Sequence, residues 1–208
     1  MTELNNLEAE YENYAKECGC ALRIIKARIE NIQQHFQDEN NGASFQIVTR
    51  STYTKRFASV KEKCERKGYN FDIESIKKNV QDIAGIRIIT TYRDDIFKIV
   101  ERIKSIQDIY ISDENDYVTK TKKNGYRSYH ITVLIGVHNK NGNMLLPVEI
   151  QIRTKSMDMW ASVEHDVKYK SNYATSEETD AMFVEMATIL DQFDQKAIDL
   201  RNSATPTC

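Results

Sequence analysis

Apolar residues recur at intervals of three and four positions through the N-terminal part of the chain. The stripe begins at Leu4 and continues through Tyr11, Cys18 and Ile25 to Phe36. This spacing predicts one long amphipathic helix, which ends at the Asn-Asn-Gly run of residues 40–42. Two interpretations of the stripe stay open: it covers the core of its own domain, or part of it packs on another subunit.

Later segments alternate between helical spacing and the shorter period of strands. The predicted helices cover residues 55–67, 94–107, 155–169 and 176–202. The predicted strands cover residues 44–51, 84–92, 109–118, 129–138 and 144–152. The last two strands are joined through Asn141 and Gly142, a pair that is typical of a hairpin turn.

Helices at both ends of the chain, around a mixed or antiparallel sheet, predict a single α+β domain. The 208 residues suit one domain with a buried core, and neither a repeat nor a break in composition divides them. Within this single domain, 1–208, we expect an N-terminal helix at 1–40, a core at 44–170 that carries the chemistry, and a C-terminal helix at 176–202. Residues 203–208 have the composition of a frayed tail.

The composition is that of a folded globular protein, with 40% hydrophobic and 29% charged residues. Lysine and arginine (29) nearly balance aspartate and glutamate (31). This balance argues against a protein whose whole surface binds nucleic acid, but it allows a local basic pocket. No signal peptide or membrane-spanning segment is predicted, so we expect a cytoplasmic protein without a membrane partner. The four cysteines and four histidines do not fit a zinc pattern.

A polar face follows from the alternation of side chains along the two strongest predicted strands. In the segment VEIQIRT, Glu149, Gln151 and Arg153 share one face, and the valine and isoleucines share the other. His130 takes the polar face of the partner strand. A carboxylate, an amide, a guanidinium and an imidazole thus converge, which favours a functional site over a solvated outer face.

The segment QDIAGIR places Asp82 just before a strand and puts Gly85 and Arg87 on one side of that strand. Gly85 allows the backbone to be approached closely. Carboxylate oxygens suit magnesium and a guanidinium suits phosphate, so Asp82 and the distant Glu149 are candidates for a magnesium–triphosphate site. The alternative is a buried ion pair between Asp82 and Arg87.

Two lysine-containing segments suit a nucleotide. In KTKKNGYRSYH, Lys122 shortly precedes a glycine turn and Tyr126, which brings a charge for phosphate close to a ring face for a base. In KRFASVKEK, Lys55, Ser59 and Lys63 are four residues apart, which puts them on one face of the predicted helix along a polyphosphate. Solvent-exposed basic surfaces are the alternative for both segments.

These segments belong to an ordered set. DIAGIR, NGYRSYH, EIQIRT and MDMWASVEHDVKYK follow one another between Lys55 and Lys170. They resemble the synthetase motifs of the alarmone synthetase family, and the lengths of the terminal helices resemble its small, single-domain members. The resemblance implies a nucleotidyltransferase-like fold and an ATP-dependent pyrophosphokinase. Such an enzyme moves the β,γ-diphosphate of ATP to the 3′-hydroxyl of GDP or GTP and makes the alarmone (p)ppGpp.

The resemblance also implies roles for individual residues. Asp82 and Glu149 would hold Mg²⁺, and Glu149 would activate the 3′-hydroxyl as a base. The residues that would bind ATP are Lys55, Ser59, Lys63 and Arg87. Tyr126 would stack on the acceptor base, and the residues around that nucleotide would be Lys122, His130, Gln151 and Asp158. The supporting residues would be Arg153, Glu164 and His165.

The chain departs from the family pattern at three places. The family has an arginine that packs on adenine two residues before the Lys55 position. In gap-free register this chain has Tyr53 there, and a tyrosine can still stack on adenine. If the loop holds a two-residue insertion, Arg50 takes that place instead. Asn115 stands where the family commonly has a cation for the 5′-phosphates of GTP. Asp158 stands where the family has an asparagine.

The last two departures keep a second function open. Toxic relatives in the family attach diphosphate to the 3′ end of tRNA, an acceptor without a free 5′-polyphosphate, which suits Asn115 and Asp158. An antitoxin is the partner expected for such a toxin. A third interpretation, an inactive nucleotide sensor or RNA-binding module, is disfavoured because both Asp82 and Glu149 are present. For assembly, the resemblance implies a homo-oligomer, a tetramer in the housekeeping members.

Overall fold

The structure, a computed structural model, describes residues 2–39, 45–139, 142–170 and 176–204, with side chains described except at 2–3, 48–53 and 168–170. The helices of this described part are α1 (Thr2–Glu39), α2 (Phe57–Lys67), α3 (Ile73–Asn79), α4 (Arg93–Lys104), α5 (Lys155–Lys170) and α6 (Glu177–Ala204). Its strands are β1 (Gln46–Thr54), β2 (Ala84–Thr90), β3 (Ile109–Asp116), β4 (Tyr129–Asn139) and β5 (Gly142–Thr154).

The strands of the described part form a five-stranded sheet in the order β1-β2-β5-β4-β3. β2 and β5 are parallel, and the other neighbours are antiparallel. β5, the last strand in the sequence, therefore lies at the centre of the sheet. This arrangement confirms the predicted α+β fold with a mixed sheet and helices at both ends. Part of the predicted hairpin turn, residues 140–141, lies outside the described residues.

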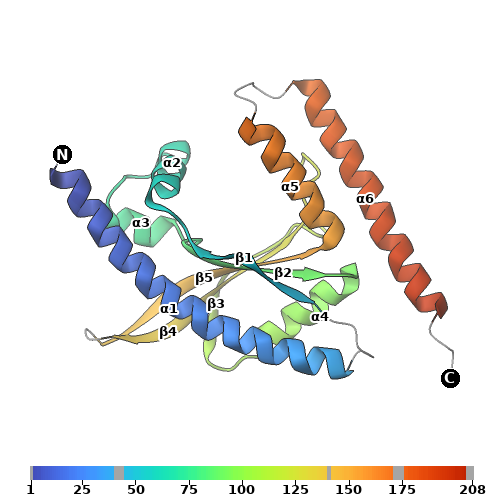
Figure 1. Ribbon diagram of the computed structural model, residues 1–208, viewed down its shortest axis with the longest axis horizontal. Coiled ribbons are helices and arrows are strands. Elements are labelled where there is room, and N and C mark those ends of the chain that lie inside the picture. The colour runs from blue at the N-terminus through green and yellow to red at the C-terminus, as the bar shows by residue number, and fades with distance from the viewer. Residues whose placement is uncertain (1, 40–44, 140–141, 171–175, 205–208) are drawn as a thin grey trace.

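The apolar face of the sheet is covered by α1, which runs from the upper left to the lower right in Figure 1, and by α4. The residues of α1 that are buried against this core recur at helical spacing and are Tyr11, Tyr14, Ala15, Cys18, Ala21, Leu22, Ile25, Ile29 and Phe36. Each fully buried isoleucine or leucine stabilises the fold by about 1.5–3 kcal/mol. Of the two interpretations of this stripe, the structure supports the first, because its buried residues cover the core of their own domain.

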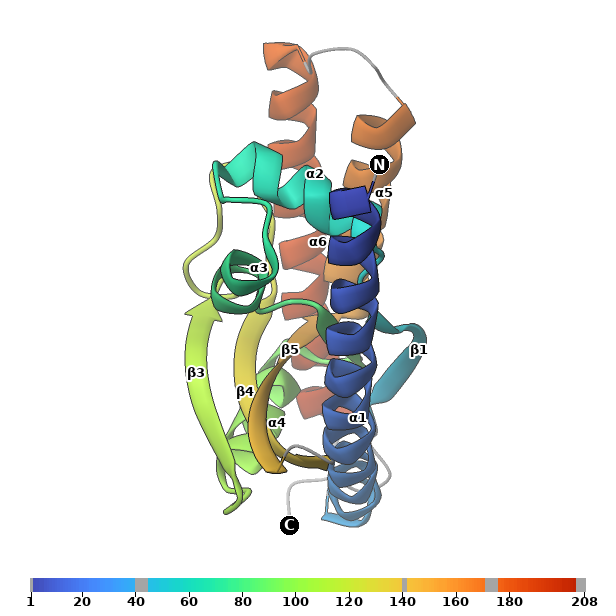
Figure 2. The ribbon, with the colours of Figure 1, turned by 90° about the vertical axis from the view of Figure 1, so that its left-hand side faces the viewer.

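The opposite face of the sheet is bordered by helices at its two ends. α2 and α3 lie beside the N-terminal part of α1 at one end (Figures 1 and 2). α5 and α6 run side by side at the other end, and α6 also contacts α4. The polar face of the strands thus lies between a pair of helices from the first half of the chain and a pair from its last part.

Several bounds differ by two or three residues from what apolar spacing predicts: β1 lies at 46–54 instead of 44–51, α4 ends at residue 104 instead of 107, and β5 covers 142–154 instead of 144–152. Two further differences concern α3 and α2. α3 is not predicted, because its seven residues hold too few apolar positions to show a period. Its one local signal is Asp72, whose side chain caps the helix by accepting a hydrogen bond from Ser75 N at 2.8 Å. α2 begins at Phe57 instead of residue 55, and it ends at Gly68 with φ +69°, as expected of a glycine after a helix.

Gly68 and Gly136 form a matched pair for a stability test, since a Cβ added to either would meet no atom within 4 Å. Gly68 has the left-handed conformation, whereas Gly136 lies within β4 and has no positive φ. We predict that Gly68→Ala lowers the free energy of unfolding by about 1 kcal/mol, because a Cβ is disfavoured at that φ. Gly136→Ala should cause no loss. Urea unfolding measures both, and equal effects would contradict the prediction.

Candidate active site

Polar side chains from three neighbouring strands share one face of the sheet. Between β2 and β5, Gly85 pairs with Glu149 and Arg87 pairs with Gln151. Between β5 and β4, Gln151 pairs with His130. Paired residues lie side by side and point to the same face. Arg87, Glu149, Gln151 and His130 therefore lie together, opposite the buried isoleucines, as the alternation predicts.

A first cavity, of about 160 Å³, opens on this face at the start of β2. The residues that line it are Lys55, Asp82, Gly85, Ile86, Arg87, Glu149 and Gln151. A Cβ on Gly85 would lie 3.7 Å from the carbonyl oxygen of Glu149, which is an ordinary contact. The packing of the protein itself thus does not require glycine there. A longer side chain at this position would occupy the cavity, because residue 85 shares its face with Arg87.

Asp82, just before β2, is paired with two lysines. Its Oδ2 lies 2.5 Å from Lys55 Nζ and its Oδ1 lies 2.7 Å from Lys63 Nζ. Burial would raise the pKa of Asp82, but the charges and hydrogen bonds of the two lysines hold that pKa below its usual value. Asp82 is therefore ionised at neutral pH, and the first cavity combines a carboxylate with cations.

The expectation that Lys55, Ser59 and Lys63 share one helical face is wrong for Lys55. This residue precedes α2, and its backbone N–H donates to the carbonyl oxygen of Ile83 at 2.7 Å. Ser59 is exposed in the first turn of α2 and is not among the residues that line the first cavity. Lys55 and Lys63 are brought together by Asp82, not by their spacing along a helix.

Glu149 begins a chain of hydrogen bonds across the polar face. Its Oε1 lies 3.2 Å from His130 Nδ1, and its Oε2 accepts from Gln151 Nε2 at 2.7 Å. His130 Nε2 lies 2.8 Å from Tyr126 Oη, which also accepts from Arg153 Nη2 at 2.7 Å. Burial would raise the pKa of Glu149, but His130 and then Gln151 hold it below its usual value. Glu149 is therefore ionised and oriented.

Arg87 is paired with Asp158 of α5. Its Nη1 lies 3.0 Å from Asp158 Oδ1, and the same oxygen lies 3.3 Å from Arg153 Nη1. Among the described residues, the ion pair between Asp82 and Arg87 that the sequence left open is not formed, since Asp82 pairs with lysines. The Nε atom of Arg87 is buried without a hydrogen-bond partner in the described part of the chain.

A second cavity, of about 500 Å³, lies between the polar face and α5. The residues that line it are Arg87, Tyr126, Arg153, Ala161, Ser162, Glu164, His165 and Asp166. Arg87 lines both cavities. Glu164 accepts a hydrogen bond from Asn124 Nδ2 at 2.6 Å, which ties α5 to the loop that carries Tyr126. The side chain of His165 is exposed on the cavity wall.

Residues 117–128, which connect β3 to β4, form the loop that we call the Tyr126 loop. Lys122 Nζ lies 4.2 Å from the ring centroid of Tyr117 and 4.8 Å from that of Tyr126. Burial lowers the pKa of Lys122, against the opposing charges of Glu164 and Glu149. The two tyrosine rings meet edge-on at 6.2 Å. Tyr117, which precedes the segment KTKKNGYRSYH, is given no role by the sequence pattern.

Comparison with known proteins decides the family. The family described as the region found in RelA and SpoT proteins matches residues 50–174. The chain is 36% identical to GTP pyrophosphokinase YwaC of Bacillus subtilis (strain 168) over 201 residues, which covers 97% of this chain and 95% of that protein. This chain belongs to the RelA/SpoT family. GTP pyrophosphokinase YjbM of the same organism is 34% identical over 164 residues, 78% of this chain and 75% of that protein.

Solved structures of this family have the same fold. The small alarmone synthetase 1 from Bacillus subtilis bound to its product pppGpp matches with a TM-score of 0.83 and 28% identity, over 95% of this chain and 99% of that chain. The small alarmone synthetase 2 from the same organism matches with a TM-score of 0.80 and 30% identity, over 94% and 100%. The expected family, fold class and diphosphotransferase activity are thereby confirmed.

The departures from the RelA/SpoT pattern have local explanations at two positions. The Asn115 side chain donates to Asp113 Oδ2 at 2.7 Å, so it is held by the strand end itself. The carboxylate of Asp158 lies between Arg87 and Arg153, which offsets the negative charge that it adds. The third departure, Tyr53 or Arg50, concerns side chains outside the described ones. No described helix of this RelA/SpoT member is long and apolar enough to cross a membrane.

Proposed function

We propose that this protein transfers the β,γ-diphosphate of ATP to the 3′-hydroxyl of GDP or GTP and so makes (p)ppGpp. The observation that supports the proposal is that two cavities with different lining residues lie next to each other and share Arg87. The first contains lysine and carboxylate groups, which suit a metal-bound polyphosphate, and the second contains Tyr126, which suits a base. The relatives that are named GTP pyrophosphokinases, and the related synthetase bound to pppGpp, support these substrates.

ATP would bind with its phosphates in the first cavity. Lys55, Lys63 and Arg87 supply the cations, and a phosphate oxygen would satisfy the buried Nε of Arg87. Catalysis of phosphoryl transfer depends mainly on positioning and on stabilising charge, which such a cluster provides. Ser59 would contact ATP only from the outer end of this site, where α2 begins, and Tyr53 or Arg50 would pack on adenine.

Mg²⁺ is the proposed cofactor, and Asp82 and Glu149 would hold it. Both carboxylates line the first cavity, and the charge of Asp82 acts to raise the pKa of Glu149. A divalent cation relieves such repulsion between neighbouring carboxylates. No cluster of three protein ligands occurs among the described residues, so phosphate and water would complete the coordination, as is usual for Mg²⁺. The metal would supply neutralisation of charge on the transferring phosphates.

Glu149 would also accept the proton of the attacking 3′-hydroxyl. Its lowered pKa keeps it ionised, and its contacts with His130 and Gln151 fix its direction. A carboxylate with a low pKa is a weak base, so its contribution comes chiefly from position. His130 also touches Tyr126, which links the base to the group that would hold the acceptor.

The metal pair is tested by neutral variants. Asp82→Asn and Glu149→Gln should each slow diphosphate transfer by a factor on the order of a hundred to a thousand or more, because each removes a group that stabilises charge in the transition state. Glu178→Gln, an exposed carboxylate at the start of α6, is the control and should change little. Circular dichroism checks folding. Near wild-type turnover in either site variant would remove that residue from the role.

The acceptor would lie in the second cavity, with its base on Tyr126 and its phosphates near Lys122. The charge of Lys67, at the end of α2, acts on Lys122, so a further cation lies near this place. These two lysines would replace the cation that the family commonly has at Asn115. Gln151 and Asp158 would contact the same nucleotide, and Arg153, Glu164 and His165 would support it.

The acceptor is tested by offering GDP, GTP and deacylated tRNA in parallel with γ-labelled ATP. We expect label on GDP and GTP, little change in Asn115→Arg, and a loss of about 1–3 kcal/mol of acceptor binding in Tyr126→Ala. Label only on the tRNA 3′ end, falling steeply as salt is added, would contradict the proposal. It would indicate the toxic branch, for which an antitoxin partner would then be sought.

We also propose a homo-oligomer that forms through the outer face of α6. The exposed apolar residues of this face recur at steps of seven and four positions and are Met182, Ile189, Phe193 and Leu200. Such spacing is typical of a seam between paired helices, and a second copy supplies an identical seam. A tetramer is the proposed size of the assembly, and the cytoplasm is its proposed location.

Assembly is tested with Phe193→Glu, which places a charge in the middle of the proposed seam. Light scattering at micromolar concentration should show an oligomer for the wild type and smaller species for this variant, because a buried unpaired charge is costly. Leu145→Glu, which changes an exposed residue of β5 far from α6 in the sequence, is the control and should not dissociate the protein. A monomeric wild type would contradict the proposal.

A further inference from the structure

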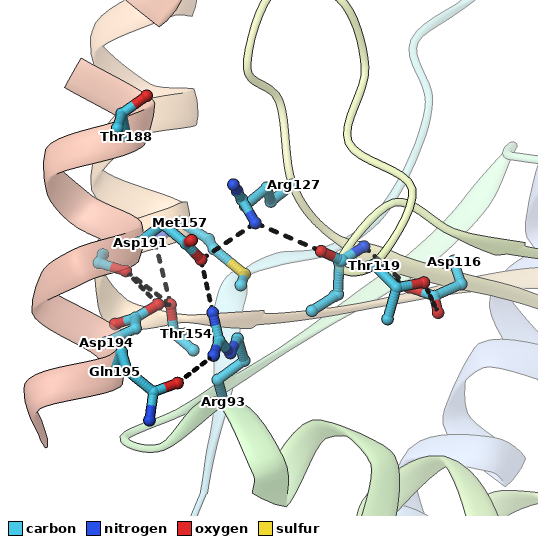
Figure 3. Close-up of polar contacts among 12 residues, drawn as sticks. Arg93, Asp116, Thr119, Arg127, Thr154, Met157, Thr188, Asp191, Asp194 and Gln195 are labelled. Carbon is cyan, nitrogen blue, oxygen red and sulfur yellow. Dashed lines mark hydrogen bonds and ion pairs between the residues drawn. The ribbon is translucent and has the colours of Figure 1, made fainter. Parts of the chain in front are cut away.

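α6 holds the Tyr126 loop directly at Gly125 and Arg127, and holds Tyr126 between them through Trp160 of α5. We propose that α6 positions this loop for the acceptor, with Asp191 as the positioning residue that acts through Arg127. The inference rests on the proposed function in one respect, that this loop binds the acceptor. Figure 3 shows Asp191 and Asp194 on α6 facing Arg93, Arg127 and the start of α5.

The first contact is between the backbone of Gly125 and α6. Gly125 has φ +90°, and a Cβ built on it would lie 2.5 Å from Ala187 Cβ and 3.4 Å from the carbonyl oxygen of Phe183. A real Cβ does not fit at 2.5 Å from another Cβ, so the loop lies directly against the helix. The void at this joint has a volume of only about 10 Å³, which leaves room for no more than about one water.

The second contact runs through aromatic rings. The ring of Tyr126 meets Trp160 of α5 at 6.1 Å, and Trp160 meets Phe183 of α6 at 5.7 Å. Trp160 is 2% exposed, and its Nε1–H donates to the carbonyl oxygen of Phe183 at 2.9 Å. The Tyr126 ring, which we propose to stack on the acceptor base, therefore packs on Trp160, and Trp160 in turn packs on Phe183 of α6.

The third contact is the ion pair between Arg127 and Asp191. Arg127 Nη1 lies 3.0 Å from Asp191 Oδ1, and it also donates to the carbonyl oxygen of Val118 at 3.4 Å (Figure 3). Val118 and Arg127 stand near the two ends of the Tyr126 loop. One arginine thus closes the loop, and one carboxylate of α6 holds that arginine.

Other polar contacts fix α6 to the body of the domain. Asp191 also accepts from Arg93 at the start of α4, with Nη1 at 2.5 Å from Oδ1. Asp194 is 2% exposed and accepts from the hydroxyls of Thr154 at 2.7 Å and Ser156 at 2.6 Å (Figure 3). These hydroxyls follow Arg153 at the junction of β5 and α5. Through these contacts, α6 connects the Tyr126 loop to β5, the strand that carries Glu149.

Of the three contacts, the one at Tyr126 reaches the second cavity, and none reaches the first. No residue of α6 is among those that line either cavity, but Tyr126, which α6 holds in place, lines the second cavity and not the first. Loosening α6 should therefore weaken the acceptor site and leave the ATP site unchanged. This separation distinguishes a positioning role from a general loss of stability, which would affect both sites.

Hydrogen exchange gives a test that does not need activity. The loop amides of Lys122 and Gly125 donate to the carbonyl oxygens of Tyr126 and Lys122, at 3.2 Å and 2.9 Å. In Asp191→Asn these amides should exchange faster, because the loop loses its anchor, while the amide of Lys55, bonded to Ile83, keeps its rate. Glu185→Gln, which changes an exposed carboxylate on the same helix, is the control and should alter neither rate.

Steady-state kinetics give the second test, on the full-length protein with labelled ATP. Asp191→Asn should raise the KM for GDP or GTP about tenfold and leave the KM for ATP unchanged. Ala187→Val reaches the same joint by steric means, since its added methyls would push α6 from Gly125, and it should give the same split. Glu185→Gln should again match the wild type.

Faster exchange in the loop together with a rise of the acceptor KM alone would support the inference. Unchanged exchange in both Asp191→Asn and Ala187→Val, or an equal rise of the two KM values, would overturn it. If the wild type transfers no diphosphate to GDP or GTP, the proposed function fails instead, and the exchange rates of the loop then decide the inference.

Discussion

Because β5 pairs with β2 along one edge and with β4 along the other, its two-residue period decides which side chains meet on the polar face. Ile150 and Ile152 are fully buried, so a slip of one residue would exchange them for Glu149 and Gln151 and bury charge in the core. The apolar core thus fixes the register, and the register fixes the position of Glu149 relative to Arg87 and His130.

The charges that this register gathers are balanced in separate groups. Asp82 is paired with lysines, Glu149 is held by His130 and Gln151, and Asp158 lies between arginines. Partly buried ions lose hydration, and their partners compensate for that loss only while both remain in place. The site is therefore electrostatically organised before any substrate arrives, and a ligand that takes one partner must replace its charge.

The sequence allowed much of the polar face to be predicted, because alternation along a strand is a local property. Glu149, Gln151 and His130 were placed together from parity alone. The position of Lys55 could not be predicted in this way. Apolar spacing alone does not distinguish a helix that begins at Phe57 from one that begins two residues earlier. The pairing of Lys55 with Asp82 depends on a contact between segments distant in sequence.

The role of α6 was beyond the reach of sequence patterns for a similar reason. Its apolar residues predict a helix, but Asp191 and Asp194 look like ordinary solvated carboxylates in such a pattern. Only the fold brings them to Arg127, Thr154 and the other groups that they bind. Tyr117 was missed because its importance comes from Lys122, which lies over its ring after the loop has folded.

The contact of Gly125 with Ala187 limits how this chain can drift through mutation. Neither position can accept a larger side chain while the other stays in place, since the loop backbone and the helix are already at van der Waals distance. A larger residue at 187 would survive selection only with a changed path of the loop. The two positions are therefore constrained as a pair, and descendants of this sequence should keep both small or replace both together.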